Sequence, residues 1–204
     1  MGFKKFFLSV TTALLVTVCV SVSGASAAEV DQNVEKMTPE QIEKINAALK
    51  EVTAEANEQL AEGETNVDVK TSVANGSIEL NVDVNPSNNQ VSSRSVSVMA
   101  VQSKSYTAIV KYVFPGAGFE HKVSGKFTYE KGKLKGNSYD VYLNGPLYGK
   151  SHSTKVEKLD PSVWEIRSNG KFKTLKYTPF EYTTRIVVGL YGSGTYRVLA
   201  SELN

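Results

Sequence analysis

The chain has 204 residues, a formal net charge of +2 and a single cysteine, Cys19. One cysteine near the N-terminus excludes a framework of intramolecular disulfides, so the fold must be held together by burial and strand pairing. The residues after position 28 are numerous enough for one sizeable core or two small ones.

The small net charge conceals a separation of charge along the chain. Residues 29–93 carry 13 acidic and 4 basic side chains, whereas residues 94–204 carry 8 acidic and 17 basic ones. All ten tyrosines and the only tryptophan, Trp164, lie in the second part. Such asymmetry predicts that each part meets a different partner, or that the two parts meet each other.

Residues 1–28 have the pattern of a secretory signal peptide. Lys4 and Lys5 precede an apolar run at residues 6–20, and small residues at 23–28 offer cleavage after Ala27 or Ala28. The run is shorter than the ~20 residues of a membrane-spanning helix. Cys19 lacks the small preceding residue typical of a lipid-attachment site. We therefore expect a secreted protein, either extracellular or associated with the cell wall.

A helix is predicted over residues 38–62. Thr38, Pro39 and Gln41 form a capping box with proline at the first helical position, and Gly63 is a natural stop. The apolar stripe consists of Ile42, Ile45, Leu49, Val52, Ala56 and Leu60. We expect this stripe to pack on a sheet, with a short coiled coil as the alternative.

A β-hairpin follows the helix. Residues 67–73 and 78–84 alternate between apolar and polar side chains around Asn75-Gly76, which is typical of a two-residue turn. The predicted cross-strand pairs are Val73 with Ile78, Thr71 with Leu80, Val69 with Val82, and Val67 with Val84. Residues 29–85 would thus form an acidic helix-plus-hairpin segment, and residues 86–105 a linker rich in serine and asparagine, in which 96–101 could be an added strand.

Residues 106–204 have the pattern of a basic all-β domain, so the predicted fold class is α+β. Short strands punctuated by glycine turns are typical of an antiparallel sandwich or small barrel. We expect a strand apolar on both faces at 106–113, a turn at Asn169-Gly170 between strands 163–167 and 172–177, and a turn at residues 192–194. Residues 149–154 are interpreted as a polar loop.

Catalytic and metal-binding patterns are weak. His121 and His152 are the only histidines, and no zinc-binding or serine-hydrolase motif surrounds them. A pair of carboxylates such as Asp140 and Glu165 could support hydrolysis of a wall glycan, but their spacing does not indicate it. We therefore predict no catalytic residue, no metal and no cofactor.

Lysines are the stronger signal. The predicted electrostatic binding surface consists of Lys122, Lys126, Lys131, Lys133, Lys135, Lys171, Lys173 and Lys176. Several lysines acting together would hold a protein to an anionic cell-wall polymer or a phospholipid surface. The plainer alternative is that these lysines block strand pairing at sheet edges. Nucleic acid is not expected, because no nucleic-acid-binding module is present.

The acidic segment suggests an intramolecular contact. Glu51, Glu55, Glu58 and Glu62 follow helical spacing, and their mutual repulsion would be relieved by an opposing basic surface. Residues 29–93 could therefore mask the basic domain as a pro-segment, cleaved near residues 94–104. Two independent modules on a tether are the alternative.

The run from Gly125-Lys126-Phe127-Thr128-Tyr129 through Lys133-Leu134 to Leu190-Tyr191-Gly192 resembles small secreted β-domain proteins of Gram-positive bacteria. This resemblance implies an exported context and no catalytic residue. The sequence as a whole predicts a secreted, non-enzymatic protein that binds the cell envelope, such as an antibacterial factor. The alternatives are an envelope hydrolase that uses a carboxylate pair, or a matrix component that self-associates through edge strands.

Overall fold

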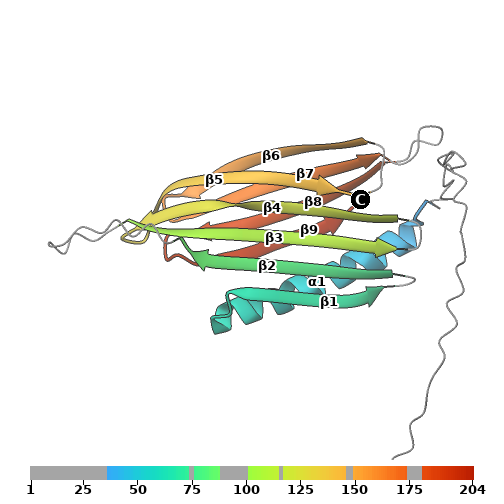
Figure 1. Ribbon diagram of the computed structural model, residues 1–204, viewed down its shortest axis with the longest axis horizontal. Helices are drawn as coiled ribbons and strands as arrows, with labels where there is room; N and C mark the ends of the chain where they lie inside the picture. The colour runs from blue at the N-terminus through green and yellow to red at the C-terminus, as the bar shows by residue number, and fades with distance from the viewer. Residues whose placement is uncertain (1–35, 74–75, 88–100, 115–116, 146–148, 174–180) are drawn as a thin grey trace, which may run out of the picture. The chain divides into compact units, whose positions relative to one another are not determined.

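The computed structural model describes residues 36–73, 76–87, 101–114, 117–145, 149–173 and 181–204. The predicted signal peptide therefore lies outside the described residues. The described elements are one helix and nine antiparallel strands in two sheets (Figure 1). They are α1 (Pro39–Glu62), β1 (Asn66–Val73), β2 (Gly76–Pro86), β3 (Gln102–Phe114), β4 (Ala117–Glu130), β5 (Lys133–Asn144), β6 (Gly149–Asp160), β7 (Val163–Lys173), β8 (Glu181–Tyr191) and β9 (Tyr196–Leu203).

The helix begins and ends where its capping residues predict. The Thr38 side chain accepts a hydrogen bond from the Gln41 amide (3.2 Å), and the Thr38 amide donates to the Gln41 side chain (2.7 Å). Gly63 ends the helix in the left-handed conformation, with φ of 103°. Four residues of the predicted apolar stripe are buried (Ile45, Leu49, Val52 and Ala56), and Ile42 and Leu60 are partly buried. The helix contacts β9, β1 and β2, which confirms that it packs on strands.

The first sheet has the order β1-β2-β3-β4-β5. The hairpin β1–β2 is present, but its predicted register is wrong by two residues, because Val73 pairs with Gly76 instead of Ile78. A shift of two keeps every valine on the inner face. Gly76 belongs to the strand because it lies against the Val113 carbonyl and the Phe114 ring, where a Cβ atom would clash.

The second sheet has the order β6-β7-β8-β9 and differs from the predicted pattern in two places. Asn169 and Gly170 continue β7 instead of forming a turn, because Gly170 leaves room for the side chains of Thr184 and His121. Residues 149–154 belong to β6, not to a loop. This strand pairs on one side only and is largely exposed, so it carries no apolar alternation.

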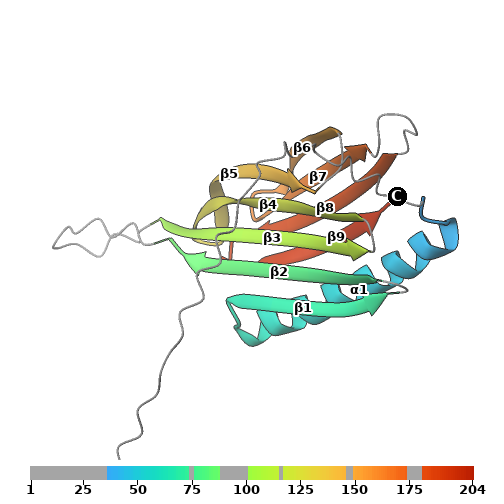
Figure 2. The ribbon, with the colours of Figure 1, turned by 45° about the vertical axis from the view of Figure 1, so that its right-hand side comes forward.

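The two sheets pack face to face as a sandwich. Strands β3, β4 and β5 face β9, β8 and β7, and α1 lies beside β9, where it covers β1 and β2 (Figures 1 and 2). The second layer is therefore four strands plus a helix. Aromatic rings fill the space between the layers, with Tyr106 stacked on Tyr196 (5.4 Å between centroids) and Phe119 packed on Phe172 (4.8 Å).

Two asparagines of α1 cap the open edge of β9. Asn57 Nδ2 donates to the Val198 carbonyl (2.6 Å), and its Oδ1 accepts from the Val198 amide (3.0 Å). Asn46 binds the amide and carbonyl of Leu203 in the same way (both 2.8 Å). Each amide thus takes the place of a neighbouring strand. The helix satisfies backbone groups that would otherwise remain unpaired at a sheet edge.

The predicted division into an acidic segment (29–85) and a separate basic domain (106–204) is wrong. Strand β2 pairs with β3 along its length, for example Val84 with Tyr106. One hydrophobic core contains buried residues of α1 and of every described strand except β6. Asn33–Asn204 form one compact unit. Of the predicted linker, Pro86 ends β2 and residues 102–105 begin β3, while residues 88–100 lie outside the described ranges.

The asparagine caps can be tested by truncation. Asn57→Ala should lower the free energy of unfolding by about 1–3 kcal/mol, because it leaves two backbone groups of Val198 without partners. Alanine is the better helix former, so helix propensity alone predicts the opposite sign. Urea denaturation measures the difference.

Glu58→Ala, at an exposed position one residue along α1, is the matched control and should change stability by less than about 0.5 kcal/mol. Equal effects of the two substitutions would contradict the role of Asn57 as an edge cap.

Candidate functional site

The separation of charge along the chain becomes a separation between the two edges of the sandwich. We call α1, β1 and β2 the acidic edge, and β4, β5, β6 and β7 the basic edge. Residues 39–86 carry ten acidic and three basic side chains, whereas residues 117–173 carry six acidic and eleven basic ones. The strand orders and the position of α1 place these groups at opposite ends of both layers (Figure 1).

Two of the predicted lysines lie on the outer face of the first sheet. Val123 and Phe127 of β4 are buried, so Lys122 and Lys126, which alternate with them, point outward. Lys122 lies across from Tyr142 of β5, whose side chain is 53% exposed. This face therefore offers cationic groups beside an accessible aromatic ring.

Three more lysines cluster where β4 turns into β5. Lys131 has a φ of 51° and precedes Gly132, so the turn presents its side chain to solvent. Lys133 is also exposed, and Lys135 forms an ion pair with Glu130 (3.1 Å). Glu130 pairs with Lys133, so these lysines lie at the tip of the β4–β5 hairpin.

The remaining predicted lysines belong to the other layer. Lys171 and Lys173 lie on the outer face of β7, and Lys171 pairs with Glu181 (3.0 Å). Lys176 lies outside the described residues. The seven described lysines therefore do not form one flat patch. They lie on the outer face of β4, on the outer face of β7 and at the β4–β5 turn. They are therefore grouped around β5 and β6, the edge strands of the two sheets, which we call the rim.

Positive charge remains in excess on the basic edge. Within the described ranges, five of the predicted lysines have no carboxylate within ion-pair distance: Lys122, Lys126, Lys131, Lys133 and Lys173. Several nearby acids are already engaged, since Arg167 binds both Glu157 (2.8 Å) and Glu165 (2.6 Å). Lys155, with a smaller effect of Arg167, also holds the pKa of Glu157 below its ordinary value. The free lysines can therefore meet an external anion.

The acidic stripe of α1 does not contact the basic edge. Glu51, Glu55, Glu58 and Glu62 are exposed, and the described part of the chain contains no ion pair between α1 and a strand. The helix is joined to β9 by burial, by its asparagines and by the hydrogen bond between Thr53 and Ser201 (2.7 Å). Between residues 36–87 and 101–204, opposed charge is paired only at Glu79 and Lys111 (2.6 Å) in the described ranges, so the acidic stripe does not mask the basic edge. Removal of residues 29–93 would also take a helix and two strands out of the core.

Asp140 and Glu165, the pair named for hydrolysis, do not come together. Glu165 instead lies opposite Glu157, and Arg167 binds both. Asp140 is exposed on the outer face of the first sheet, across from Ser124. Glu165 lies on the outer face of the second sheet, bound to Arg167. Two carboxylates on opposite outer faces cannot flank one glycosidic bond, which requires a separation below about 10 Å.

A buried polar network joins the layers, and the sequence pattern did not indicate it. His121 of β4 is fully buried, with Nδ1 hydrogen-bonded to Thr184 (2.8 Å) and Nε2 to Ser168 (2.9 Å). Ser168 continues to Thr154 (2.9 Å), which contacts the exposed His152 (3.3 Å). Burial, with a smaller effect of His152, lowers the pKa of His121 to about 4. A neutral imidazole therefore ties β7 and β8 of the second sheet to the first, and Ser168 extends the network to β6.

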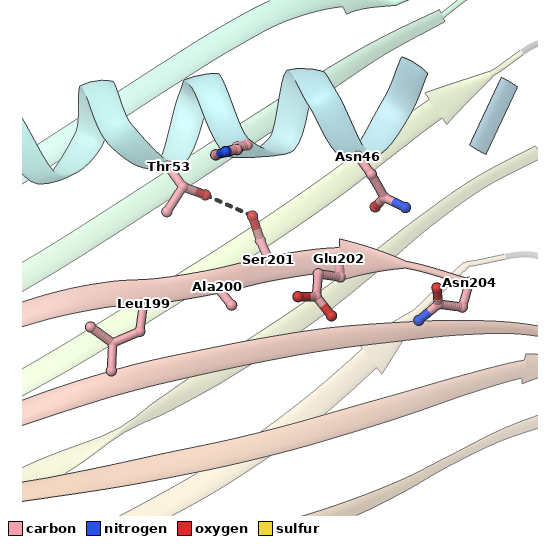
Figure 3. A pocket seen from close by; sticks show the side chains of 8 residues that line it. Asn46, Thr53, Leu199, Ala200, Ser201, Glu202 and Asn204 are labelled. Carbon is pink, nitrogen blue, oxygen red and sulfur yellow. Dashed lines mark hydrogen bonds between the residues drawn. The ribbon is translucent and has the colours of Figure 1, made fainter. Parts of the chain in front are cut away.

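A cavity of about 460 Å³ lies where α1 meets β9 (Figure 3). Asn46 and Thr53 approach it from the helix, and Ser201, Glu202 and Leu199 approach it from the strand. Its volume would admit a small ligand. Its polar groups are already engaged: Thr53 and Ser201 join the helix to β9, and Glu202 pairs with Arg185 of β8 (3.2 Å).

No described helix is long and apolar enough to cross a membrane. In the same ranges, no three histidine, cysteine, aspartate or glutamate side chains gather in a way that could hold a metal ion. Comparisons with protein-family models, curated proteins and solved structures gave no match. The resemblance to secreted β-domain proteins therefore stays a prediction.

The buried histidine predicts a pH dependence of stability. The unfolded chain binds a proton at His121 below its ordinary pKa of about 6.5, whereas the folded chain does so only near 4. The contribution of His121 is therefore fully present above pH 6.5 and is lost as pH falls to 4, by about 3 kcal/mol. Urea denaturation across this range measures it.

His121→Gln should flatten the pH dependence relative to wild type, because glutamine does not titrate. His152→Gln, on the exposed side of the same network, is the control and should retain most of it. A steep decline that persists in His121→Gln would contradict the assignment.

Proposed function

We propose that this is an exported, non-enzymatic protein that attaches through its basic edge to an anionic cell-envelope surface, either a wall polymer or phospholipid headgroups. The observation that supports the proposal is the placement of charge: unpaired lysines surround one edge of the sandwich, and the acidic residues lie at the other. Such a molecule would approach an anionic surface in one orientation.

Protection of sheet edges is the competing role for these lysines, and it does not account for four of them. Lys122 and Lys126 lie on β4, which is paired on both sides, and Lys171 and Lys173 lie on β7, which is also paired on both sides. Lysine blocks unwanted pairing only on a strand with a free edge. Charges on the faces of interior strands favour binding to an external surface.

Export is part of the proposal. Its support is the sequence pattern of residues 1–28, with a charged start, an apolar run and small residues before the predicted cleavage sites. An anionic wall polymer or membrane surface is then the polyanion that an exported protein would meet first.

Charge removal on the basic edge tests the proposal. The protein would be purified from the culture medium, where its intact mass should show a chain beginning at Ala28 or Glu29. Lys122→Gln/Lys126→Gln and Lys131→Gln/Lys133→Gln should each weaken binding to anionic liposomes and purified cell walls by on the order of 30-fold, since each lysine contributes about 1 kcal/mol near such a surface. Salt should weaken wild-type binding in the same assays.

Lys50→Gln/Lys70→Gln is the matched control, because it removes two exposed lysines from the acidic edge. It should leave binding nearly unchanged. Attachment that is insensitive to salt, or an equal loss in all three double variants, would refute binding through the basic edge.

A further inference from the structure

The acidic edge has no part in the proposed function, because an anionic surface would repel it. Its charge is concentrated on one flank of α1. Asn46 and Asn57 face β9, and Glu51, Glu55, Glu58 and Glu62 lie about 140° around the helix axis from them, given 3.6 residues per turn. These glutamates therefore point away from β9, at the outer end of the second layer, and all four are exposed.

Three sheet edges are open in the described part of the chain. Strand β1 pairs only with β2, β5 only with β4, and β6 only with β7. The fourth edge, β9, is capped by the two asparagines of α1. The open strands lie at the two ends of the layers, β1 with the acidic edge and β5 and β6 with the basic edge. Unpaired strands present backbone donors and acceptors to another chain.

We propose that the partner of the acidic edge is the basic edge of a second copy of this chain, in a head-to-tail arrangement. Two acidic edges repel each other, as do two basic edges, so symmetric pairing through like edges is disfavoured. Unlike edges attract. The contact is heterologous, leaves one free edge of each kind, and can therefore add further copies.

The charges lie at matching positions along the two edges. Glu55, Glu58 and Glu62 are near the end of α1, which shares a small cavity with the β8–β9 turn. Lys158 is near the end of β6, and Lys155 is at its middle, paired with Glu157. The β6–β7 turn that follows is hydrogen-bonded to the same β8–β9 turn, Gly192 to Ser162 (2.7 Å). The glutamates and Lys158 thus lie toward one end of the sandwich. A sideways translation brings α1 of one copy beside β6 of the next, and β1 beside β5.

This inference does not rest on the proposed function. An anionic polymer and the acidic edge of a second copy would compete for the basic edge, yet each contact has its own assay. Self-association is measured with the protein alone, and envelope binding is measured with walls or liposomes. Failure of either leaves the other standing.

Sedimentation velocity of the purified protein over a concentration series tests the proposal. At about 10 mM ionic strength, where charges act over about 30 Å, the weight-average mass should rise above that of one chain as concentration increases. At about 1 M it should return to that of one chain, because the range falls to about 3 Å. A wild-type protein that stays monomeric at low ionic strength overturns the proposal.

Charge reversal identifies the surfaces. The variant Glu51→Lys/Glu55→Lys/Glu58→Lys has two basic edges, and Lys133→Glu/Lys155→Glu/Lys158→Glu has a much more acidic rim. Each alone should be monomeric at low ionic strength, and an equimolar mixture should assemble. Thermal unfolding checks that both variants fold; if either does not, the single reversals Glu55→Lys and Lys133→Glu replace them in the same mixture. Assembly that survives either reversal, or a mixture of folded variants that stays monomeric, overturns the proposal.

Discussion

The pairing of β2 with β3 is the contact on which the rest of the structure depends. It runs from Ser77 opposite Val113 to Pro86 opposite Lys104 and joins the acidic part of the chain to the tyrosine-rich part in one sheet. A hairpin such as β1–β2 is marginal alone in water. Once β2 is paired, its buried residues face the same core as those of β3, and α1 has a surface on which to pack. The helix then closes the free edge of β9 through Asn46 and Asn57.

A shared core changes the meaning of the charge separation. Two tethered modules could approach or leave each other, so opposed charges would attract within one chain. In the sandwich, the strand order holds most acidic and basic groups at opposite edges. Among the described residues, one ion pair joins the two parts of the chain, Lys111 of β3 with Glu79 of β2 (2.6 Å). The other charges of the two edges are available to other molecules. The predicted intramolecular mask is therefore absent from the described residues, and the molecule instead carries negative charge at one edge and positive charge at the other. Both the proposed envelope contact and the inferred contact between copies use this arrangement.

Local features were well predicted from the sequence. The limits of α1 follow from Thr38, Gln41 and Gly63, which act within a few residues of the helix ends. The α+β class and the antiparallel sandwich follow from alternation and turn residues. The failures have tertiary causes. Gly76 and Gly170 read as turn residues, but they lie in strands because β3 and His121 approach their backbones. Residues 149–154 were predicted as a loop because an exposed edge strand needs no apolar alternation.

The candidate site was predictable in part. Alternation shows that Lys122 and Lys171 point outward from their strands. It cannot show that these strands belong to different layers, because that depends on the chain passing from the first sheet to the second between β5 and β6. The His121 network was also hidden, because Ser168 and Thr184 are ordinary strand residues until the layers bring them to the imidazole. Asn46 and Asn57 likewise gain their role only when β9 lies beside the helix.

The central claim is that both parts of the chain fold as one cooperative unit, and urea unfolding followed by two probes tests it most directly. Ellipticity at the helix band reports on α1, the one α-helix among the described residues, and fluorescence reports on Trp164 of β7, which is buried beneath Lys158 (4.3 Å from nitrogen to ring centroid). A shared core predicts coincident transitions with one midpoint. Loss of the helix signal at lower urea, with the Trp164 signal still native, would contradict the account.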